Sequence, residues 1–177
     1  MNEVERIYNE LVSIEKILVE ANSPSELVAF SSNSSKVMLL AAASYFERRI
    51  CQDIEMYGRE VINLDHIPSF IAKQGLERKY HTLFQWEATN ANKFFSLFGA
   101  RFSAWVKGKV KEESLEPAIR AFLALGNQRN ELVHENYATF PVNSTYEEIW
   151  KSFTEGLHFI DWFPVKLREF PSEPKEE

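Results

Sequence analysis

The chain is poor in cysteine, and Cys51 is the single thiol among its 177 residues. One cysteine excludes a disulfide-stapled scaffold and a zinc site built from several thiolates. Such sparse cysteine is typical of proteins from a reducing compartment. A chain of this length can bury about 70% of the surface that its unfolded form exposes, so we expect a hydrophobic core to hold the fold.

Positive charge is also scarce, because 20 Lys and Arg stand against 26 Asp and Glu and give a net charge of −6. An acidic chain does not coat nucleic acid in general, so any contact with RNA must come from a local patch. Long hydrophobic runs are missing too: the run 37–46 is far shorter than the roughly 20 residues of a membrane-spanning helix. The first residues lack the basic and apolar regions of a signal peptide, and we expect a soluble, cytoplasmic protein.

Several signatures of catalytic or cofactor sites are absent. The sequence has no glycine-rich phosphate loop, no His-Glu-x-x-His and no serine elbow. Its four histidines, at 66, 81, 134 and 158, are not spaced as metal ligands. We expect no metal and no cofactor.

Helical periodicity dominates what is present. Over residues 2–20, apolar side chains recur at spacings of three and four, which predicts an amphipathic helix. Ser23-Pro24-Ser25-Glu26 is a capping box that opens a second helical stretch. We expect Ser31–Ser35 to be a break or weak joint, with a long helix from Lys36 to about Tyr57. Gly58 is expected to end this helix, whose apolar run 37–46 should lie centrally in a bundle.

The rest of the chain is predicted to be helical as well. Short helices are expected at 68–74 and 90–97, and Ser114–Pro117 opens a long helix that Gly126 interrupts without ending. Its apolar positions are Ile119, Phe122, Leu123, Leu132 and Val133. A last helix starts at the capping box Ser144–Glu147 and runs to Pro164, before a frayed tail at 169–177. Because no alternating strand pattern occurs, we predict an all-α fold, a four-helix up-down bundle.

One polar cluster, Arg129-Asn130-Glu131-Leu132-Val133-His134, stands out from the helical pattern. At 100° per residue, Arg129 and His134 diverge by about 140°, whereas Asn130 and His134 share a face. A straight helix does not aim Arg129 and His134 at one phosphate. The helix is therefore irregular there, or a second copy of the chain completes the site. Alternatively, both side chains only favour the helix dipole and solvent.

This cluster resembles the Arg, four-to-six residues, His signature of HEPN domains, including the polar residue after the Arg. The stretch Leu39–Ile50 resembles the second helix of that family, most of all in its RiboL-PSP branch. The resemblance covers the core helices, about 2–58 and 114–163, and leaves an unmatched insertion at about 59–113. It implies an α-helical bundle that dimerises through the motif-bearing helix. Many members are metal-independent endoribonucleases, often toxins or antiviral effectors.

The resemblance also implies roles for individual residues. His134 would remove the proton of a ribose 2′-hydroxyl, and Arg129 would hold the phosphate, with Asn130 in support. Glu47 corresponds to a polar residue that orients the arginine, or it is an ordinary solvated charge. One branch of the family carries a modifiable tyrosine two residues after the histidine. Here Asn136 stands at that position, so Tyr137 is expected to be a buried or interface aromatic.

Residues 101–111 form the most basic segment and contain no acid. Its four cations, interleaved with Phe102 and Trp105, suit phosphate contacts and base stacking, and they are Arg101, Lys107, Lys109 and Lys111. Alternatively, this segment is an amphipathic helix with its aromatics packed inward. We expect the chain to be a homodimeric RNase that acts as a toxin or phage-defence effector. The expected partners are RNA and an antitoxin or defence-system protein. The alternative is a non-catalytic HEPN-like scaffold or regulatory module, and no feature of the sequence points to a small-molecule binder.

Overall fold

The computed structural model describes residues 2–62, 68, 71–76 and 79–171, and within them it is helical without any strand. The prediction of an all-α fold is confirmed. The elements are α1 (Glu3–Glu20), α2 (Pro24–Ile62), the π-helix η1 (Ala72–Leu76), α4 (Tyr80–Leu83), α5 (Asn92–Ser96), α6 (Ala100–Glu112), α7 (Glu116–His134) and α8 (Tyr146–Glu169). Among the described residues, no helix has the length and apolar character to cross a membrane.

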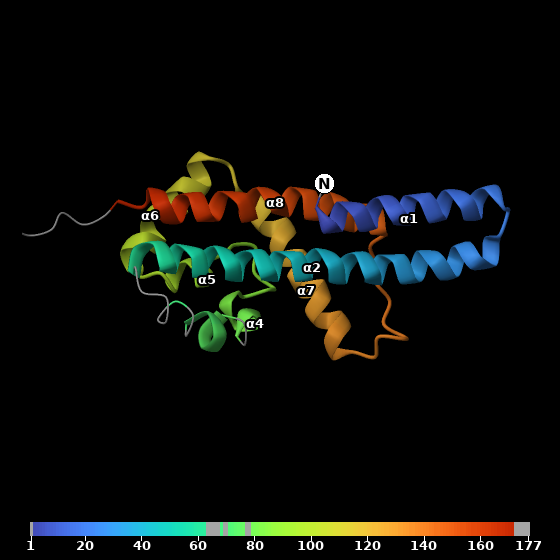
Figure 1. The fold of residues 1–177 in the computed structure, drawn as a ribbon, viewed down its shortest axis with the longest axis horizontal. Coiled ribbons are helices and arrows are strands. Elements are labelled where there is room, and N and C mark those ends of the chain that lie inside the picture. Colours follow the sequence, from blue (N-terminus) through green and yellow to red (C-terminus); the bar gives the residue numbers. More distant parts are fainter. Residues whose placement is uncertain (1, 63–67, 69–70, 77–78, 172–177) are drawn as a thin grey trace, which may run out of the picture.

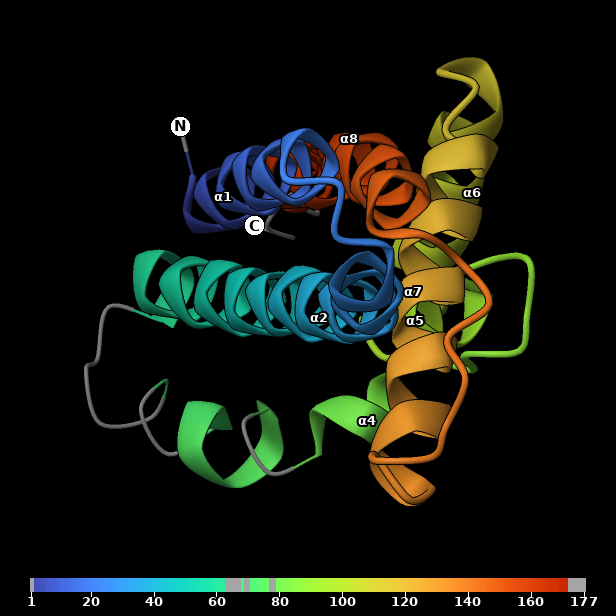
Figure 2. The same ribbon diagram turned by 90° about the vertical axis from the view of Figure 1, so that its right-hand side faces the viewer.

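The 39-residue helix α2 is the axis of the molecule. At 1.5 Å per residue it is about 58 Å long, and α1 and α8 lie one after the other along it (Figure 1). The four long helices α1, α2, α7 and α8 alternate in direction along the chain, and α7 runs obliquely across α2 and α8 (Figures 1 and 2). This arrangement places the end of α7, which carries the Arg/His motif, against the middle of α2.

Of the two expectations for Ser31–Ser35, the break is wrong, because α2 continues through it, and the continuous helix agrees with a segment inside one helix. The hydroxyl groups of Ser34 and Ser35 both donate to the Ser31 carbonyl, and the Asn33 amide donates to the Ala29 carbonyl. These side chains therefore satisfy their hydrogen bonds on the helix itself. Ser34 and Ser35 are also buried, so tertiary packing outweighs their weak helix propensity.

Other predicted helix ends are also corrected. Gly58 lies inside α2, where the Arg59–Glu55 pair at 2.7 Å spans one turn across it. The capping box of α8 uses Thr145 and Glu148, one residue later than predicted, and α8 continues past Pro164 to Glu169. A proline removes one backbone donor, but the buried residues on both sides of it keep the helix intact.

Residues of the predicted insertion join the main core rather than forming a separate lobe. Phe84 stacks on Phe94 at a centroid distance of 4.3 Å, and it also contacts Phe122 of α7 at 4.9 Å. Phe94 in turn contacts Phe163 of α8. The short helix expected at 90–97 is observed as α5. The helix expected at 68–74 falls partly outside the described residues. Its described part overlaps the π-helix η1.

Candidate functional site

The helix that carries the motif is regular throughout, and α7 ends at His134 itself. Arg129 therefore points toward α2, where its guanidinium lies 3.7 Å from the carboxylate of Glu47. The same guanidinium donates to the side-chain oxygen of Asn130 at 3.3 Å. Glu47 is about one-third exposed and pairs with Arg129, so both interpretations of Glu47, an orienting residue and a solvated charge, stay open.

Arg129 lies in a small hollow between α2, α7 and the segment that follows α4. Its lining consists of Ala43, Phe46, Glu47, Tyr80, Trp86, Phe122, Gly126, Arg129 and Asn130. The volume is about 10 Å³, roughly that of one water-sized probe, so no nucleotide fits inside it. The Arg129 side chain is about one-third exposed.

Trp86 forms the lid of this hollow by packing directly on Gly126, one turn before Arg129. A Cβ atom built on Gly126 would lie 2.1 Å from Cζ3 of the indole, so only glycine leaves room for the ring. The indole N–H donates to the His81 carbonyl at 2.8 Å, and the ring also contacts Phe84 and Phe122. The absence of a side chain at position 126 thus serves close packing against Trp86. In the sequence, Gly126 was interpreted only as an interruption of the helix.

His134 lies on the other side of Trp86, in a wide and open hollow of about 570 Å³. This hollow is lined by Gln85, Trp86, Glu87, Asn127, Asn130, Glu131, His134, Glu135 and Phe140. Asn130 and His134 share it, as their spacing predicted, whereas Arg129 does not line it. Trp86 and Asn130 line both hollows, so the hollow of Arg129 and the hollow of His134 adjoin.

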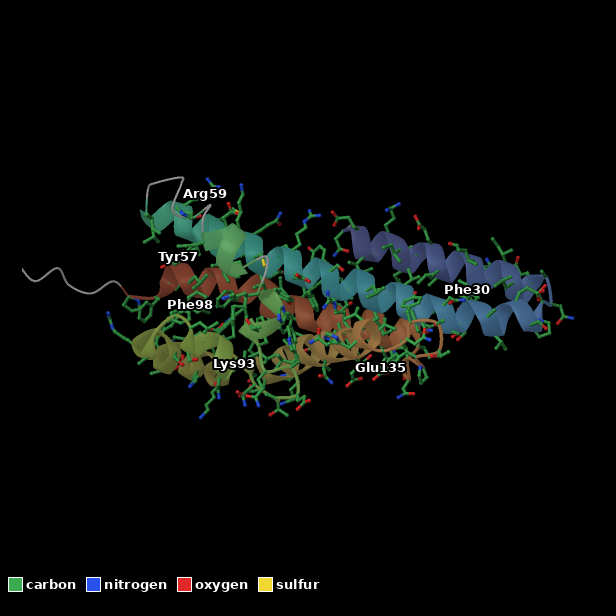
Figure 3. The ribbon with its side chains drawn as sticks, turned by 90° about the horizontal axis from the view of Figure 1, so that it is seen from below. Phe30, Tyr57, Arg59, Lys93, Phe98 and Glu135 are labelled. Atoms are coloured by element: carbon green, nitrogen blue, oxygen red, sulfur yellow. The ribbon has the colours of Figure 1, made fainter. Side chains whose placement is uncertain are left out.

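The charge around His134 is negative. Glu87, Glu131 and Glu135 line its hollow, and Glu131 accepts a hydrogen bond from the Asn127 amide at 2.8 Å. Figure 3 shows Glu135 where α7 gives way to the following loop. In the part of the chain that the structure describes, no group of three or more His, Cys, Asp or Glu side chains is arranged to hold a metal ion.

The loop after His134 is fastened to α2 by a buried lysine. The Lys36 ammonium donates to the Tyr137 carbonyl at 2.7 Å and lies 5.1 Å from the centre of the Tyr137 ring. Lys36 is only 4% exposed, so this contact is the main compensation for its buried charge. Tyr137 itself is 45% exposed, so a buried aromatic is wrong, and the alternative of an interface aromatic stays a prediction. Val133, one of the apolar positions of the predicted helix, is 47% exposed as well.

The four cations of the basic segment are in different situations. The Arg101 guanidinium donates to the Pro171 carbonyl, and Lys109 pairs with Glu112 at 2.6 Å. Among the described residues, Lys107 and Lys111 form no ion pair, and both line a further hollow of about 230 Å³. Phe102 is buried and Trp105 half-buried, as the amphipathic alternative expects.

Three residues near the motif were not predicted from the sequence as part of the site, and they are Tyr80, Trp86 and Lys36. Tyr80 is almost fully buried beside Arg129 and Glu47, and this burial raises the pKa of its phenol well above the usual value. Its hydroxyl therefore stays neutral at physiological pH. A lone aromatic far from the motif in sequence gives no signal of this role, because it depends on how the segment from 79 onward folds back onto α7.

Comparisons with known proteins bear on the family. The model of the RiboL-PSP-HEPN family matches residues 2–164, a range that includes the segment 59–113 left unmatched by the sequence interpretation. Neither the search of curated proteins nor that of solved structures gave a match. The matched range covers the four long helices, the Glu47–Arg129 pair and the Arg129–His134 motif. The chain belongs to the RiboL-PSP-HEPN family.

Proposed function

We propose that this chain is a homodimeric, metal-independent endoribonuclease that acts as a toxin or phage-defence effector. The observation that carries the proposal is the ion pair between Arg129 and Glu47, which holds the guanidinium at the edge of a hollow beside the groove of His134. The Arg129 side chain is about one-third exposed, and a guanidinium offers a fork of N–H donors that matches phosphate oxygens. Family membership adds support, because HEPN proteins are often RNases.

The proposed chemistry uses the substrate's own nucleophile. His134 accepts the proton of the ribose 2′-hydroxyl, and the resulting oxygen attacks the adjacent phosphorus. Arg129 stabilises the charge that develops on the phosphate oxygens, and Glu47 and Asn130 keep its side chain in place. The bond between phosphorus and the 5′-oxygen breaks, and this oxygen takes up a proton from water or from the protonated His134, leaving a 2′,3′-cyclic phosphate and a 5′-hydroxyl. Because the nucleophile belongs to the RNA, the reaction needs no metal-bound water, and DNA is spared.

A second copy of the chain is part of the proposal. In one chain, Arg129 and His134 line different hollows, and α7 has no irregularity that would bring the two side chains together. A two-fold axis beside α7 would put Arg129 of one copy and His134 of the other into one cleft. The exposed side chains of Val133 and Tyr137 near the end of α7 offer an apolar surface for such a contact.

A non-catalytic HEPN scaffold is the second candidate, and one observation favours it. The three carboxylates around His134 repel the phosphates of RNA, and the net charge of −6 acts in the same direction. In a scaffold, the same acidic groove would receive a basic segment of a protein partner. In the RNase proposal too, an antitoxin could place a basic segment in this acidic hollow and cover the motif.

The deciding experiment is incubation of the purified chain with total RNA in EDTA. We expect cleavage that resists the chelator and leaves cyclic-phosphate ends, which a 3′-end assay detects. A DNA oligonucleotide of the same sequence as a cleaved RNA is the control and should stay intact. Complete absence of cleavage at micromolar protein, with and without divalent metal ions, would support the scaffold.

A further inference from the structure

We propose that the hollow between α5, α6 and the start of α7 binds a small organic anion with a flat apolar body. This site is separate from the Arg/His motif and goes beyond the proposed RNase function. Its volume is about 230 Å³, which suits a ligand the size of a phenyl phosphate or an aromatic carboxylate. Its lining is Thr89, Asn90, Ala91, Asn92, Phe95, Lys107, Val110, Lys111, Glu116 and Ile119.

The charge of the lining favours an anion. Lys107 and Lys111 stand four residues apart on α6, so their side chains leave the same face about 5–6 Å apart at Cβ. In the described part of the chain neither forms an ion pair, whereas Lys109, between them on the same helix, pairs with Glu112. Glu116 adds one carboxylate, so two ammonium groups against one carboxylate leave a net charge of +1. An anionic group between the two lysines would therefore be stabilised by charge-assisted hydrogen bonds.

The remainder of the lining favours an apolar body rather than a bare ion. Ala91, Phe95, Val110 and Ile119 are all at most 8% exposed and form the floor. The rim carries the hydroxyl of Thr89 and the amides of Asn90 and Asn92, which hydrogen-bond either donors or acceptors. An apolar floor with a few convergent polar groups is the usual composition of a small-molecule site. The side of the molecule on which α5, α6 and α7 lie is seen in Figure 3, with Lys93 labelled on α5.

The position of the hollow separates it from the motif. Ile119 precedes Arg129 by ten residues, which is about 15 Å along α7. None of its lining residues lines the hollow of Arg129 or that of His134. Binding here is therefore testable without reference to RNA cleavage.

The test measures binding of phenyl phosphate and benzoate to the full chain by isothermal titration calorimetry, with phenol and inorganic phosphate as half-ligands. We expect at least one of the two organic anions to bind about tenfold more tightly than either half-ligand. The variant K107E/K111E should weaken that binding at least about tenfold. The control K109E reverses one charge on the same helix outside the hollow, which is half the charge change of the double variant, and it should bind within about twofold of wild type.

Three outcomes would overturn the proposal. They are no binding of either organic anion at millimolar concentration, an equal loss of binding in K109E, and binding that survives in K107E/K111E. If the third outcome is accompanied by a loss of RNA binding in K107E/K111E, the two lysines are assigned to RNA instead. Circular dichroism of each variant checks that the helices are intact. We expect them to be intact, because Lys107 is half-buried and Lys111 is exposed on α6.

Discussion

The carboxylate of Glu47 on α2 lies 3.7 Å from the guanidinium of Arg129 on α7, and each side chain is about one-third exposed. An ion pair with this exposure contributes about 1 kcal/mol or less to stability. Its effect on the arginine's position matters more, because a small misplacement of a phosphate-binding group can lower a rate about a hundredfold. The pair is therefore expected to influence activity far more than folding.

Glu47→Gln tests this expectation, since glutamine has the same shape and lacks the charge. We expect RNA cleavage to fall by about tenfold to a hundredfold, while the free energy of unfolding changes by less than about 1 kcal/mol. Urea titration and a cleavage assay on the same preparation measure both quantities. Cleavage at the wild-type rate would mean that Glu47 is only a solvated charge.

Arg129→Lys is expected to be inactive or nearly so. Lysine keeps the positive charge but loses the planar fork that holds two phosphate oxygens together. Binding of uncleavable 2′-deoxy substrate, followed by fluorescence anisotropy, should change much less than the cleavage rate. If lysine restores full cleavage, Arg129 acts as a point charge and its bidentate role is wrong.

His134→Ala should abolish cleavage and leave the fold intact, because His134 is exposed at the last position of α7. Loss of a general base lowers a rate by about 10²–10⁴. Thermal unfolding of the variant should match wild type within a few degrees. A folded His134→Ala chain that still cleaves RNA normally would remove the general base from the proposed mechanism.

Self-association gives a further prediction. Because one chain keeps Arg129 and His134 in different hollows, we expect activity to fall on dilution below the dimer dissociation constant. Mixing inactive R129K with inactive H134A should restore part of the activity, since mixed dimers contain one complete cleft. Light scattering that reports a monomer at concentrations where RNA is still cleaved would contradict the composite site.

Gly126→Ala is expected to displace Trp86, because the new methyl group would lie 2.1 Å from Cζ3 of the indole. We expect a loss of about 1–3 kcal/mol in the free energy of unfolding and a red shift of tryptophan emission. Gly108→Ala on α6 is the matched control, because nothing lies within 4 Å of its Cβ position. The control should gain about 0.5–1 kcal/mol from better helix propensity.

The sequence was most informative where periodicity alone determines structure. Three features follow from apolar spacing and from prolines in the first turn, which are local signals. They are the stripe of α1, the start of α2 at Pro24 and the opening of α7 at Glu116-Pro117. The predicted stops at Ser31–Ser35 and Gly58 failed because packing and side-chain hydrogen bonds compensate there for weak propensity. Propensity marks where a helix is free to end, and tertiary contacts decide whether it does.

The candidate site was likewise predictable from the sequence only where the signal is local. Arg129 and His134 were found because they are close in sequence, and their divergence around α7 follows from helix geometry. Trp86 and Tyr80 were missed, since they approach Gly126 and Arg129 only after the segment that follows α4 folds back across α7. Within the residues that the structure describes, Lys107 and Lys111 form no ion pair, and this depends on neighbours from other elements, which no local pattern reveals.

The unbroken course of α2 links the surroundings of both motif residues. Lys36 holds the chain just after His134, and Glu47 holds Arg129, eleven residues further along the same helix. Eleven residues complete three turns with about 20° to spare, so both anchors leave one face of α2, about 16 Å apart. Inserting or deleting one residue between them would rotate one anchor by about 100° relative to the other. A change of length in α2 would thus alter the position of Arg129 or of the chain just after His134, although neither motif residue lies on that helix.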